Sequence, residues 1–358
     1  MAPFVSALVV IIALRSWPTD IYALTPGDAT NVSSLVSVKG LATDPHRDRI
    51  DLVDVYLQSL SELQYLNLKF FGQHREFVGA DQLLEPGVPS SQLLAQGYLE
   101  MSDSQTAAKV AALRALGWRV PATPAGAVVA AVVANTPASR AGVAVGDEIT
   151  AIDGRRVTGL CSLLAAMVHV AVGARVALTV APGHFSSAGV LTRSAPRTKV
   201  VTAASSPDAG SATGCAGIAR SGPSWLGVSA EDGVDYAFPG DITLNTANIG
   251  GPSAGLAMTL TLIDALSRGS LTGGRAIATT GTIDPLGNVG AIGGVAEKTI
   301  AVENAGIHYF FVPRDNYAAA EAVAAKSLHV VGVSTLSQVL KDLRRLGGAD
   351  PVPLTTPH

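Results

Sequence analysis

The stretch Asn248-Ile249-Gly250-Gly251-Pro252-Ser253-Ala254-Gly255 decides how the C-terminal region folds. Pro252 suits the first turn of a helix, where its missing N–H costs nothing, and a long apolar helical pattern follows. Ser253 then lies at a helix N-terminus, where unpaired backbone N–H groups favour negative charge. The glycines allow a substrate backbone to come close. We interpret Ser253 as a nucleophile whose substrate develops an oxyanion, with Gly251, Pro252 and Ala254 supporting it.

A second motif supplies a base for this hydroxyl. Gly293-Gly294-Val295-Ala296-Glu297-Lys298-Thr299 opens another predicted helix. A serine hydroxyl is a weak nucleophile without a base, and a lysine can act as one only after its pKa falls from about 10.4. Burial among apolar side chains lowers a lysine pKa. We therefore pair Ser253 with Lys298, and we expect Thr280 to orient the amine by a hydrogen bond.

The order of these motifs resembles a known family. NIGGPSAG at 248–255, ATTGTIDPLGNVGAIGGVAEK at 278–298 and AGIHYFFVPRDN at 305–316 are similar to the proteolytic domain of Lon proteases. In that family the Ser of GPSAG is the nucleophile, the Lys of the EK pair is the base, and the Thr of the TG pair helps to position the Lys. The resemblance assigns these roles to Ser253, Lys298 and Thr280. It implies a serine-type endopeptidase of the Ser-Lys dyad type.

Two departures from the Lon pattern shape this expectation. Gly250 stands where Lon usually has an acidic residue, so substrate positioning beside the nucleophile is expected to differ. The sequence also contains no G-x-x-x-x-G-K-[ST] phosphate loop. Lon carries an ATPase that unfolds substrates. We expect no cofactor here, and ATP-independent cleavage of unfolded, short or exposed segments.

The middle of the chain has the features of a peptide-binding domain. Thr136-Pro137-Ala138-Ser139-Arg140-Ala141-Gly142-Val143, then Gly146-Asp147 and the hairpin pair Asp153-Gly154, resemble the PDZ domains of bacterial envelope proteases. PDZ domains add an extended peptide to a sheet edge. The resemblance implies capture of C-terminal or extended peptides from substrates or adaptors. The alternative is that the groove is vestigial and the domain serves only to hold the protease at a distance from the membrane.

The expected groove lies between a strand near 128–133 and a helix at 162–170. Val128, Val129 and His169 are the candidate peptide-contacting residues. A single histidine on an apolar helix is more often a packed or surface residue than a ligand.

The N-terminus carries an apolar run. Residues 2–14 are almost uninterrupted by polar side chains before Arg15, but a helix of that length rises about 20 Å against the roughly 30 Å of a hydrocarbon core. We interpret 1–24 as a membrane anchor or export signal; a buried strand or helix is the alternative. Together with the PDZ motif, it resembles the membrane-anchored, Lon-like PDZ proteases of bacteria. That resemblance implies a cell-membrane protein with its catalytic part outside the cytoplasm.

The expected fold is an α+β multidomain chain. It combines a Lon-type proteolytic α/β domain, a PDZ β-sandwich-like domain and an N-terminal helical and extended region. The expected segments are an extended and helical region at 25–121, a PDZ domain at 122–200, a Gly/Ser/Ala-rich linker at 201–224, a proteolytic domain at 225–346 and a flexible tail at 347–358. Predicted N-terminal helices cover 50–71 and 92–116. Predicted proteolytic strands cover 242–246, 276–280, 309–312 and 330–333, and helices cover 253–267, 295–305, 318–325 and 336–343.

Composition excludes several classes. The 358 residues are 48% hydrophobic and 15% charged with a net charge of −3, which excludes a mainly disordered chain and gives no sign of nucleic-acid binding. Cys161 and Cys215 have no CxxC or His-rich spacing around them, so no metal site is expected. A disulfide in an oxidising compartment is one interpretation. Two unpaired structural thiols are the favoured one.

Rival functions use some of the same residues. Gly251–Gly255 also fits the G-x-S-x-G nucleophile elbow of α/β-hydrolases, and Asp284, Asp315, His308 and His329 follow in a suitable order. Both histidines, however, fall at or within apolar strand runs rather than on loops, and no HGGG element is present. A chymotrypsin-like protease would need a G-x-S-G-G setting, which is missing. A PDZ adaptor with an inactive peptidase fold is the non-enzymatic alternative. Self-association is expected only because Lon-type domains often form rings.

Overall fold

The computed structural model describes residues 18–45, 48–71, 76–247 and 249–357. Most of the segment interpreted as an anchor or export signal, residues 1–17, lies outside these ranges. Within the described part of the chain, no helix is both long enough and apolar enough to cross a membrane.

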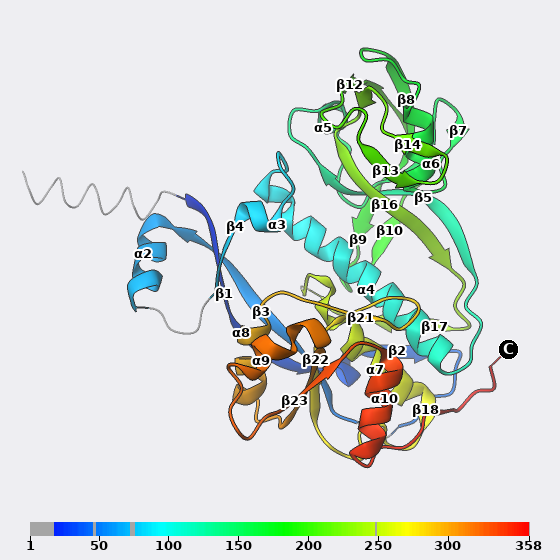
Figure 1. The fold of residues 1–358 in the computed structure, drawn as a ribbon. Coiled ribbons are helices and arrows are strands. Elements are labelled where there is room, and N and C mark those ends of the chain that lie inside the picture. The colour runs from blue at the N-terminus through cyan, green and yellow to red at the C-terminus, as the bar shows by residue number, and fades with distance from the viewer. Residues whose placement is uncertain (1–17, 46–47, 72–75, 248, 358) are drawn as a thin grey trace, which may run out of the picture.

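The lower lobe in Figure 1 is built on a mixed sheet that uses both ends of the chain. Among the described residues its strand order is β23-β22-β19-β3-β1-β4. β3 (Ile50–Ser61) pairs in parallel with β19 (Ile277–Thr279) and antiparallel with β1 (Pro18–Asn31). N-terminal strands therefore lie in the middle of the proteolytic sheet. The expectation of a separate N-terminal region at 25–121 is wrong.

The remaining elements of this lobe extend that sheet or flank it. The strands are β2 (Val36–Lys39), β4 (Glu76–Gly79), β17 (Asp241–Leu244), β18 (Ser267–Arg268), β20 (Thr282–Ile283), β21 (Val289–Gly290), β22 (Tyr309–Pro313), β23 (His329–Val333) and β24 (Val352–Pro353). The helices are η1 (Val32–Leu35), α2 (Glu62–Phe71), α3 (Ala80–Leu83), η2 (Ser90–Gln92), α4 (Leu93–Ala115), η3 (Pro252–Ala254), α7 (Gly255–Leu266), α8 (Val295–Asn304), η4 (Arg314–Asn316), α9 (Tyr317–Glu321) and α10 (Leu336–Arg345). The elements predicted from residue 242 to 343 are confirmed within a few residues at their ends.

Helices cover both faces of the sheet because its strands are apolar on both sides. Successive strand residues point to opposite faces. Leu52 belongs to the same buried cluster as residues of α4, α7 and α10, whereas Val53 belongs to a cluster with residues of α8 and α9. Phe311 and Phe310 alternate in the same way on β22. This two-sided burial produces an α/β sandwich with the sheet as its middle layer.

The same two-sided burial explains a wrong prediction. The pattern at 50–71 indicated one helix, but the structure has strand β3 followed by helix α2. Residues 50–53 of β3 are all buried, since they lie in the sheet interior with helices above and below. An apolar run of that kind does not show the alternation that distinguishes a strand from a helix. The other predicted helix, 92–116, is confirmed as α4, which ends before Gly117 at φ +87°.

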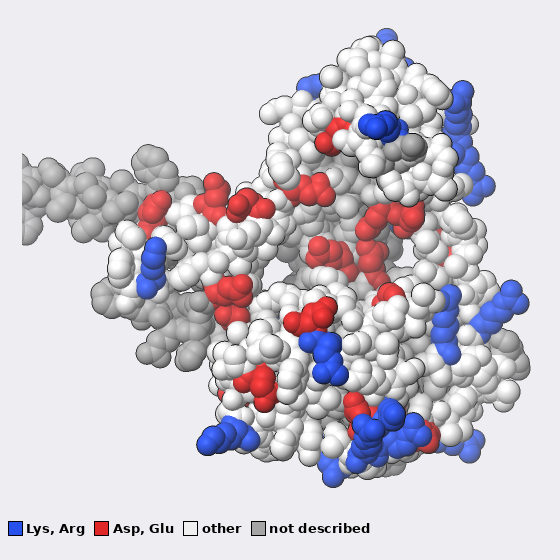
Figure 2. Space-filling model, in the orientation of Figure 1, with Lys and Arg blue, Asp and Glu red and all other residues white. Residues whose placement is uncertain are grey.

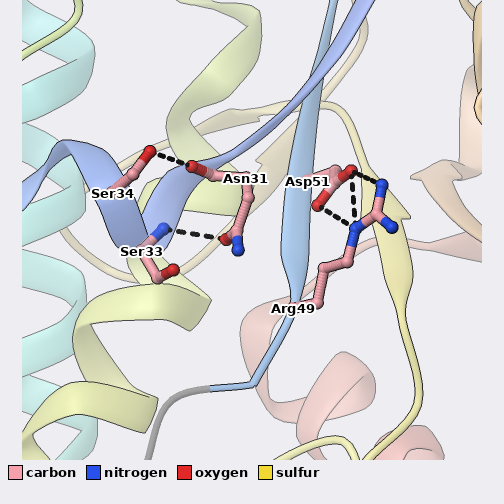
Figure 3. Close-up of polar contacts among 5 residues, drawn as sticks. All are labelled: Asn31, Ser33, Ser34, Arg49 and Asp51. Atoms are coloured by element: carbon pink, nitrogen blue, oxygen red, sulfur yellow. Dashed lines mark hydrogen bonds and ion pairs between the residues drawn. The ribbon is translucent and has the colours of Figure 1, made fainter. Parts of the chain in front are cut away.

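Two polar contacts fix the point where β1 leaves the sheet and β3 enters it (Figure 3). Asn31 and Asp51 are opposite each other in the β1–β3 ladder. The Asn31 side chain accepts a hydrogen bond from the Ser33 amide at the start of η1. Asp51 is fully buried and accepts two hydrogen bonds from Arg49 Nε at 3.2 Å and one from Nη2 at 2.8 Å. Arg49 partners this carboxylate locally, because an unpaired buried carboxylate is costly.

The upper lobe in Figure 1 is the PDZ-like domain, and its main sheet extends further along the chain than expected. The strand order is β11-β8-β6-β5-β16, with β7 paired to β6, within the described ranges. β16 (Val228–Tyr236) pairs antiparallel with β5 (Ala122–Val132). Residue 225 therefore does not begin the proteolytic domain, because β16 belongs to the PDZ sheet.

The segment predicted as a linker, 201–224, is also structured. It contains part of β11 (Arg197–Thr202) and the short strands β12 (Ala204–Ser205), β13 (Ala212–Cys215), β14 (Ile218–Arg220) and the first residue of β15 (Ser224–Trp225). The other elements of this lobe are α5 (Pro137–Arg140), β6 (Glu148–Ile152), β7 (Arg155–Arg156), α6 (Leu160–Met167), β8 (Arg175–Ala181), β9 (Gly183–Phe185) and β10 (Leu191–Arg193). The predicted flexible tail likewise contains β24, which pairs with β18.

A disulfide attaches the segment at 201–224 to helix α6. Cys161 in the first turn of α6 is bonded to Cys215 at the end of β13, across 54 residues of sequence. The favoured interpretation of two unpaired thiols is wrong. Small and polar residues alone would leave this hairpin weakly held, so the covalent bond supplies what apolar burial does not.

Removing this bond is expected to destabilise the PDZ lobe. Closing a loop of this length restricts the unfolded chain, so the Cys161→Ser/Cys215→Ser variant should lose about 2–4 kcal/mol of unfolding free energy. Denaturant titration followed by Trp fluorescence, with and without a reducing agent, measures the loss. Reductant should destabilise the parent protein and leave the double variant unchanged; equal stability of the two proteins under oxidising conditions would contradict the expectation.

Candidate active site

The structure brings the two residues of the predicted dyad together. Lys298, on α8, directs its amine at the hydroxyl of Ser253, and the Nζ–Oγ distance is 2.6 Å. Ser253 lies in η3, the single turn that leads into α7. Lys298 is 2% exposed. The contact therefore joins a nucleophile at a helix start to a lysine shielded from water.

The environment of Lys298 lowers its pKa to about 8, because burial penalises the ammonium form. The negative charge of Asp54 acts in the opposite direction and raises that pKa. Nζ also donates a hydrogen bond to the Val53 carbonyl at 2.9 Å. A large share of the amine is thus neutral in mildly alkaline solution, and its lone pair can take the Ser253 proton.

Backbone contacts on two sides fix the turn that carries Ser253. Gly251 has φ +85°, a conformation that favours glycine, and its N–H donates to the Gly97 carbonyl of α4 at 2.8 Å. The Ser253 carbonyl accepts hydrogen bonds from the Gly281 N–H at 2.9 Å and the Thr280 hydroxyl at 3.2 Å. Thr280 thus contacts the nucleophile's own backbone. The expectation that Thr280 orients the amine is corrected, since Val53 does so.

The other supporting residues keep their expected places. Pro252 begins η3 and Ala254 ends it. The Ser253 amide therefore lies in the first turn of a helix, where N–H groups have no acceptor within the helix.

Two residues of the site were missed from the sequence. Val53 and Asp54 lie on β3, within the segment predicted as a helix, so nothing placed them near Lys298. The pKa of Asp54 is raised by burial, partly offset by a hydrogen bond from the Asp28 N–H. Only the assignment of residues 50–55 to a buried strand of the central sheet would have placed Val53 and Asp54 near Lys298.

Asp284, His308 and His329, three residues of the hydrolase alternative, make their contacts away from the Ser253 hydroxyl. His308 and His329 are exposed at the start of neighbouring strands, and the His329 ring stacks on Tyr309 with centroids 5.3 Å apart. Asp284 accepts hydrogen bonds from Leu286 and Asn288 within its own turn. Ser253 Oγ is instead bonded to Lys298.

The three residues expected to contact a peptide in the PDZ domain do not line an open sheet edge. Val128 and Val129 are buried in β5, which pairs with β6 on one side and with β16 on the other. Neither can accept an added strand. His169 is exposed in a turn after α6 rather than on the helix. The edge of the sheet beside α6 is β16, whose Asp232 accepts a hydrogen bond from the Leu160 N–H at 2.7 Å.

Acidic side chains gather in the hollow between the two lobes (Figure 2). A cavity of about 320 Å³ lies next to the nucleophile turn and is lined by Pro252 and Thr282 together with Glu100, Asp103, Glu231 and Asp284. Within the part of the chain that the structure describes, including this cavity, no cluster of three or more His, Cys, Asp and Glu side chains is suited to hold a metal ion.

Comparison with known proteins agrees with this geometry. Residues 245–345 match the family model of the Lon protease (S16) C-terminal proteolytic domain, and residues 114–184 match the PDZ domain model. The chain is similar to the Lon protease of Chloroflexus aggregans, with 37% identity over 93 residues, 25% of this chain and 11% of that protein. The Lon proteases of Heliobacterium modesticaldum and Rickettsia bellii are 36% identical over 111 residues (30% of this chain, 13% of that protein) and 30% identical over 125 (34% and 16%). The chain thus spans only a small part of these relatives' length.

The matches identify residues 245–345 as a proteolytic domain of the Lon (S16) type. The protein combines that domain with a PDZ domain in one chain. The structure also shows that each domain is larger than its matched range, because β3 completes the proteolytic sheet and β16 completes the PDZ sheet.

The lowered pKa of Lys298 predicts the pH dependence of peptide hydrolysis. Because the base must be neutral, kcat/KM should rise with pH through a midpoint near 8. Asp54→Asn removes the charge that favours the ammonium, so the midpoint should move to lower pH by roughly half a unit to one unit.

Asp28→Asn is the matched control, since Asp28 contacts Asp54 rather than Lys298. The pH midpoint of kcat/KM for Asp28→Asn should equal that of the parent protein. A midpoint above 10 in the parent, or an upward shift in Asp54→Asn, would contradict the assignment of Lys298 as base.

Proposed function

We propose that this protein is an ATP-independent serine endopeptidase that hydrolyses peptide bonds in unfolded or exposed segments by a Ser253–Lys298 dyad. The observation that carries the proposal is the 2.6 Å contact between a buried lysine amine and a serine hydroxyl at the start of a helix. ATP independence rests on the absence of a phosphate loop from the sequence.

The geometry supports a two-step acyl transfer. Neutral Lys298 takes the Ser253 proton while Oγ attacks the carbonyl carbon, and the C=O electron pair moves to the oxygen. When the tetrahedral intermediate collapses, Lys298 gives the proton to the leaving amine and an ester to Ser253 remains. Water, deprotonated by Lys298, then attacks the ester; the acid product leaves and Ser253 regains its proton.

The same proposal includes peptide capture by the PDZ domain. β16 ends the sheet, and the half-buried apolar side chains Val228 and Ala230 of this strand lie against the same core as Ala166 and Val170 from the α6 segment. A strand with a free edge beside an apolar helix is suited to adding an extended peptide. Because Glu231 of β16 also lines the cavity beside Pro252, captured segments would be held near the nucleophile.

Localisation and assembly complete the proposal. We propose a cell-membrane protein attached through its N-terminus, with the catalytic part outside the cytoplasm. The Cys161–Cys215 disulfide supports this, because disulfides persist mainly in oxidising compartments. Self-association is proposed only by analogy with Lon-type domains.

Substitutions test the dyad against its rivals. Ser253→Ala and Lys298→Ala should each lower kcat for an unfolded protein substrate by roughly a thousandfold or more, as loss of a nucleophile or base does. Lys298→Arg should be equally inactive, since a guanidinium stays protonated. A fluorescent casein assay without ATP measures all of these.

His308→Ala and His329→Ala are the matched controls and should keep parent activity. Loss of activity in either would favour the hydrolase triad. An inactive parent whose Ser253 does not react with a serine-directed fluorophosphonate would favour the PDZ adaptor with an inactive peptidase fold.

Peptide capture has its own test. A labelled peptide with a free C-terminal carboxylate should bind the Ser253→Ala protein more tightly than its amidated form, measured by fluorescence anisotropy. Ala166→Glu places a charge beside the apolar groove and should weaken binding at least tenfold, whereas Ala165→Glu, on the exposed side of α6, should not. Equal binding by both variants would contradict capture at this groove.

A further inference from the structure

Helix α4 reaches the nucleophile turn from outside the matched proteolytic range. Ser104, in the middle of α4, is 4% exposed and donates a hydrogen bond from Oγ to the Pro252 carbonyl at 3.0 Å. The same carbonyl accepts the Gly255 N–H at the end of η3. Nearer the start of α4, the Gly97 carbonyl accepts a hydrogen bond from the Gly251 N–H. Two peptide units of the turn, Gly250–Gly251 and Pro252–Ser253, are therefore tied to this helix.

The Pro252 carbonyl has a direct geometric link to catalysis. It belongs to the same peptide unit as the Ser253 N–H, and this unit is planar and trans, so its C=O and N–H point in opposite directions. Fixing the carbonyl toward α4 therefore fixes the N–H away from α4. That N–H belongs to the nucleophile and lies in the unpaired first turn of the helix, where a backbone donor can stabilise a developing oxyanion.

We propose that Ser104 is a positioning residue for oxyanion stabilisation. It does not touch the substrate; it holds the Pro252–Ser253 peptide plane so that the Ser253 amide is oriented before the reaction begins. The proposal rests on the function proposed above and extends the catalytic machinery to a helix that also supports the PDZ lobe. Preorganised donors lower the barrier because they need no reorientation as charge develops.

Ser104→Ala removes the hydrogen bond and should lower kcat about five- to tenfold, the effect of one net hydrogen bond. KM should stay within about twofold, and the pH midpoint set by Lys298 should not move. Ser104→Cys keeps the shape with a much weaker donor and should lose about as much activity. This second variant separates loss of the donor from creation of a cavity.

Ser102→Ala is the matched control. Ser102 is another buried serine of α4, but its hydroxyl accepts the Leu191 N–H on the PDZ side at 3.0 Å and makes no contact with the nucleophile turn. This variant should keep kcat within about twofold even though its thermal midpoint falls. Comparing the two variants separates an effect on the turn from a general effect on α4.

A peptide boronate gives a readout that a purely structural role would not change. Boron forms a tetrahedral adduct with Ser253, whereas the amide of the same peptide binds without one. Ser104→Ala should weaken boronate inhibition by the same factor as kcat and leave inhibition by the amide unchanged. Equal weakening of both inhibitors, or equal kcat losses in the Ser104 and Ser102 variants, would overturn the proposal. A parent protein that neither hydrolyses peptides nor is inhibited by the boronate would instead refute the proposed function.

Discussion

Withdrawal of one ammonium group from water is the constraint on which the site depends. Lys298 is almost fully buried, and its amine has two hydrogen-bond acceptors, the Val53 carbonyl and the Ser253 hydroxyl. A buried ammonium with so few partners is unfavourable, which is why its pKa falls. The charge of Asp54 limits that fall. The position of the titration therefore results from a balance between burial and one nearby carboxylate.

This balance requires parts of the chain that are far apart in sequence. Ser253 and Lys298 both come from the C-terminal region, on η3 and α8, but the Val53 acceptor comes from β3, which pairs with β19 across more than half of the chain. The turn that holds Ser253 is tied in addition to α4. The PDZ sheet is inserted between these N-terminal elements and the remainder of the proteolytic fold, and α4 packs against both.

The placement of Ser253 and Lys298 in the candidate site was predictable because its signals are local. Pro252 and Ser253 mark a helix start within a few residues, and Lys298 follows in a fixed order with its own helix. Val53 and Asp54 were not predictable, because a parallel strand buried on both faces lacks alternation and its partners lie elsewhere in the sequence. The PDZ groove was also predicted at the wrong strand, because the strand's neighbour is distant in sequence. Val128 and Val129 belong to a strand with the right composition, but the strand that covers its outer edge, β16, comes about a hundred residues later. Composition also could not show that the Gly/Ser-rich segment at 201–224 is held by Cys161 and Cys215.

The split arrangement of the proteolytic sheet has a consequence for biosynthesis. A ribosome makes β3 long before α8, so the Val53 carbonyl exists in the nascent polypeptide well before Lys298 does. The contact between Ser253 and Lys298 can form only after the inserted PDZ sheet and α8 have been synthesised. A fragment starting near residue 245 would contain both reactive side chains but not the strand that shields the amine, and its lysine would remain hydrated and protonated. The order of the elements along the chain therefore places the burial of the Lys298 amine late in the synthesis of the protein.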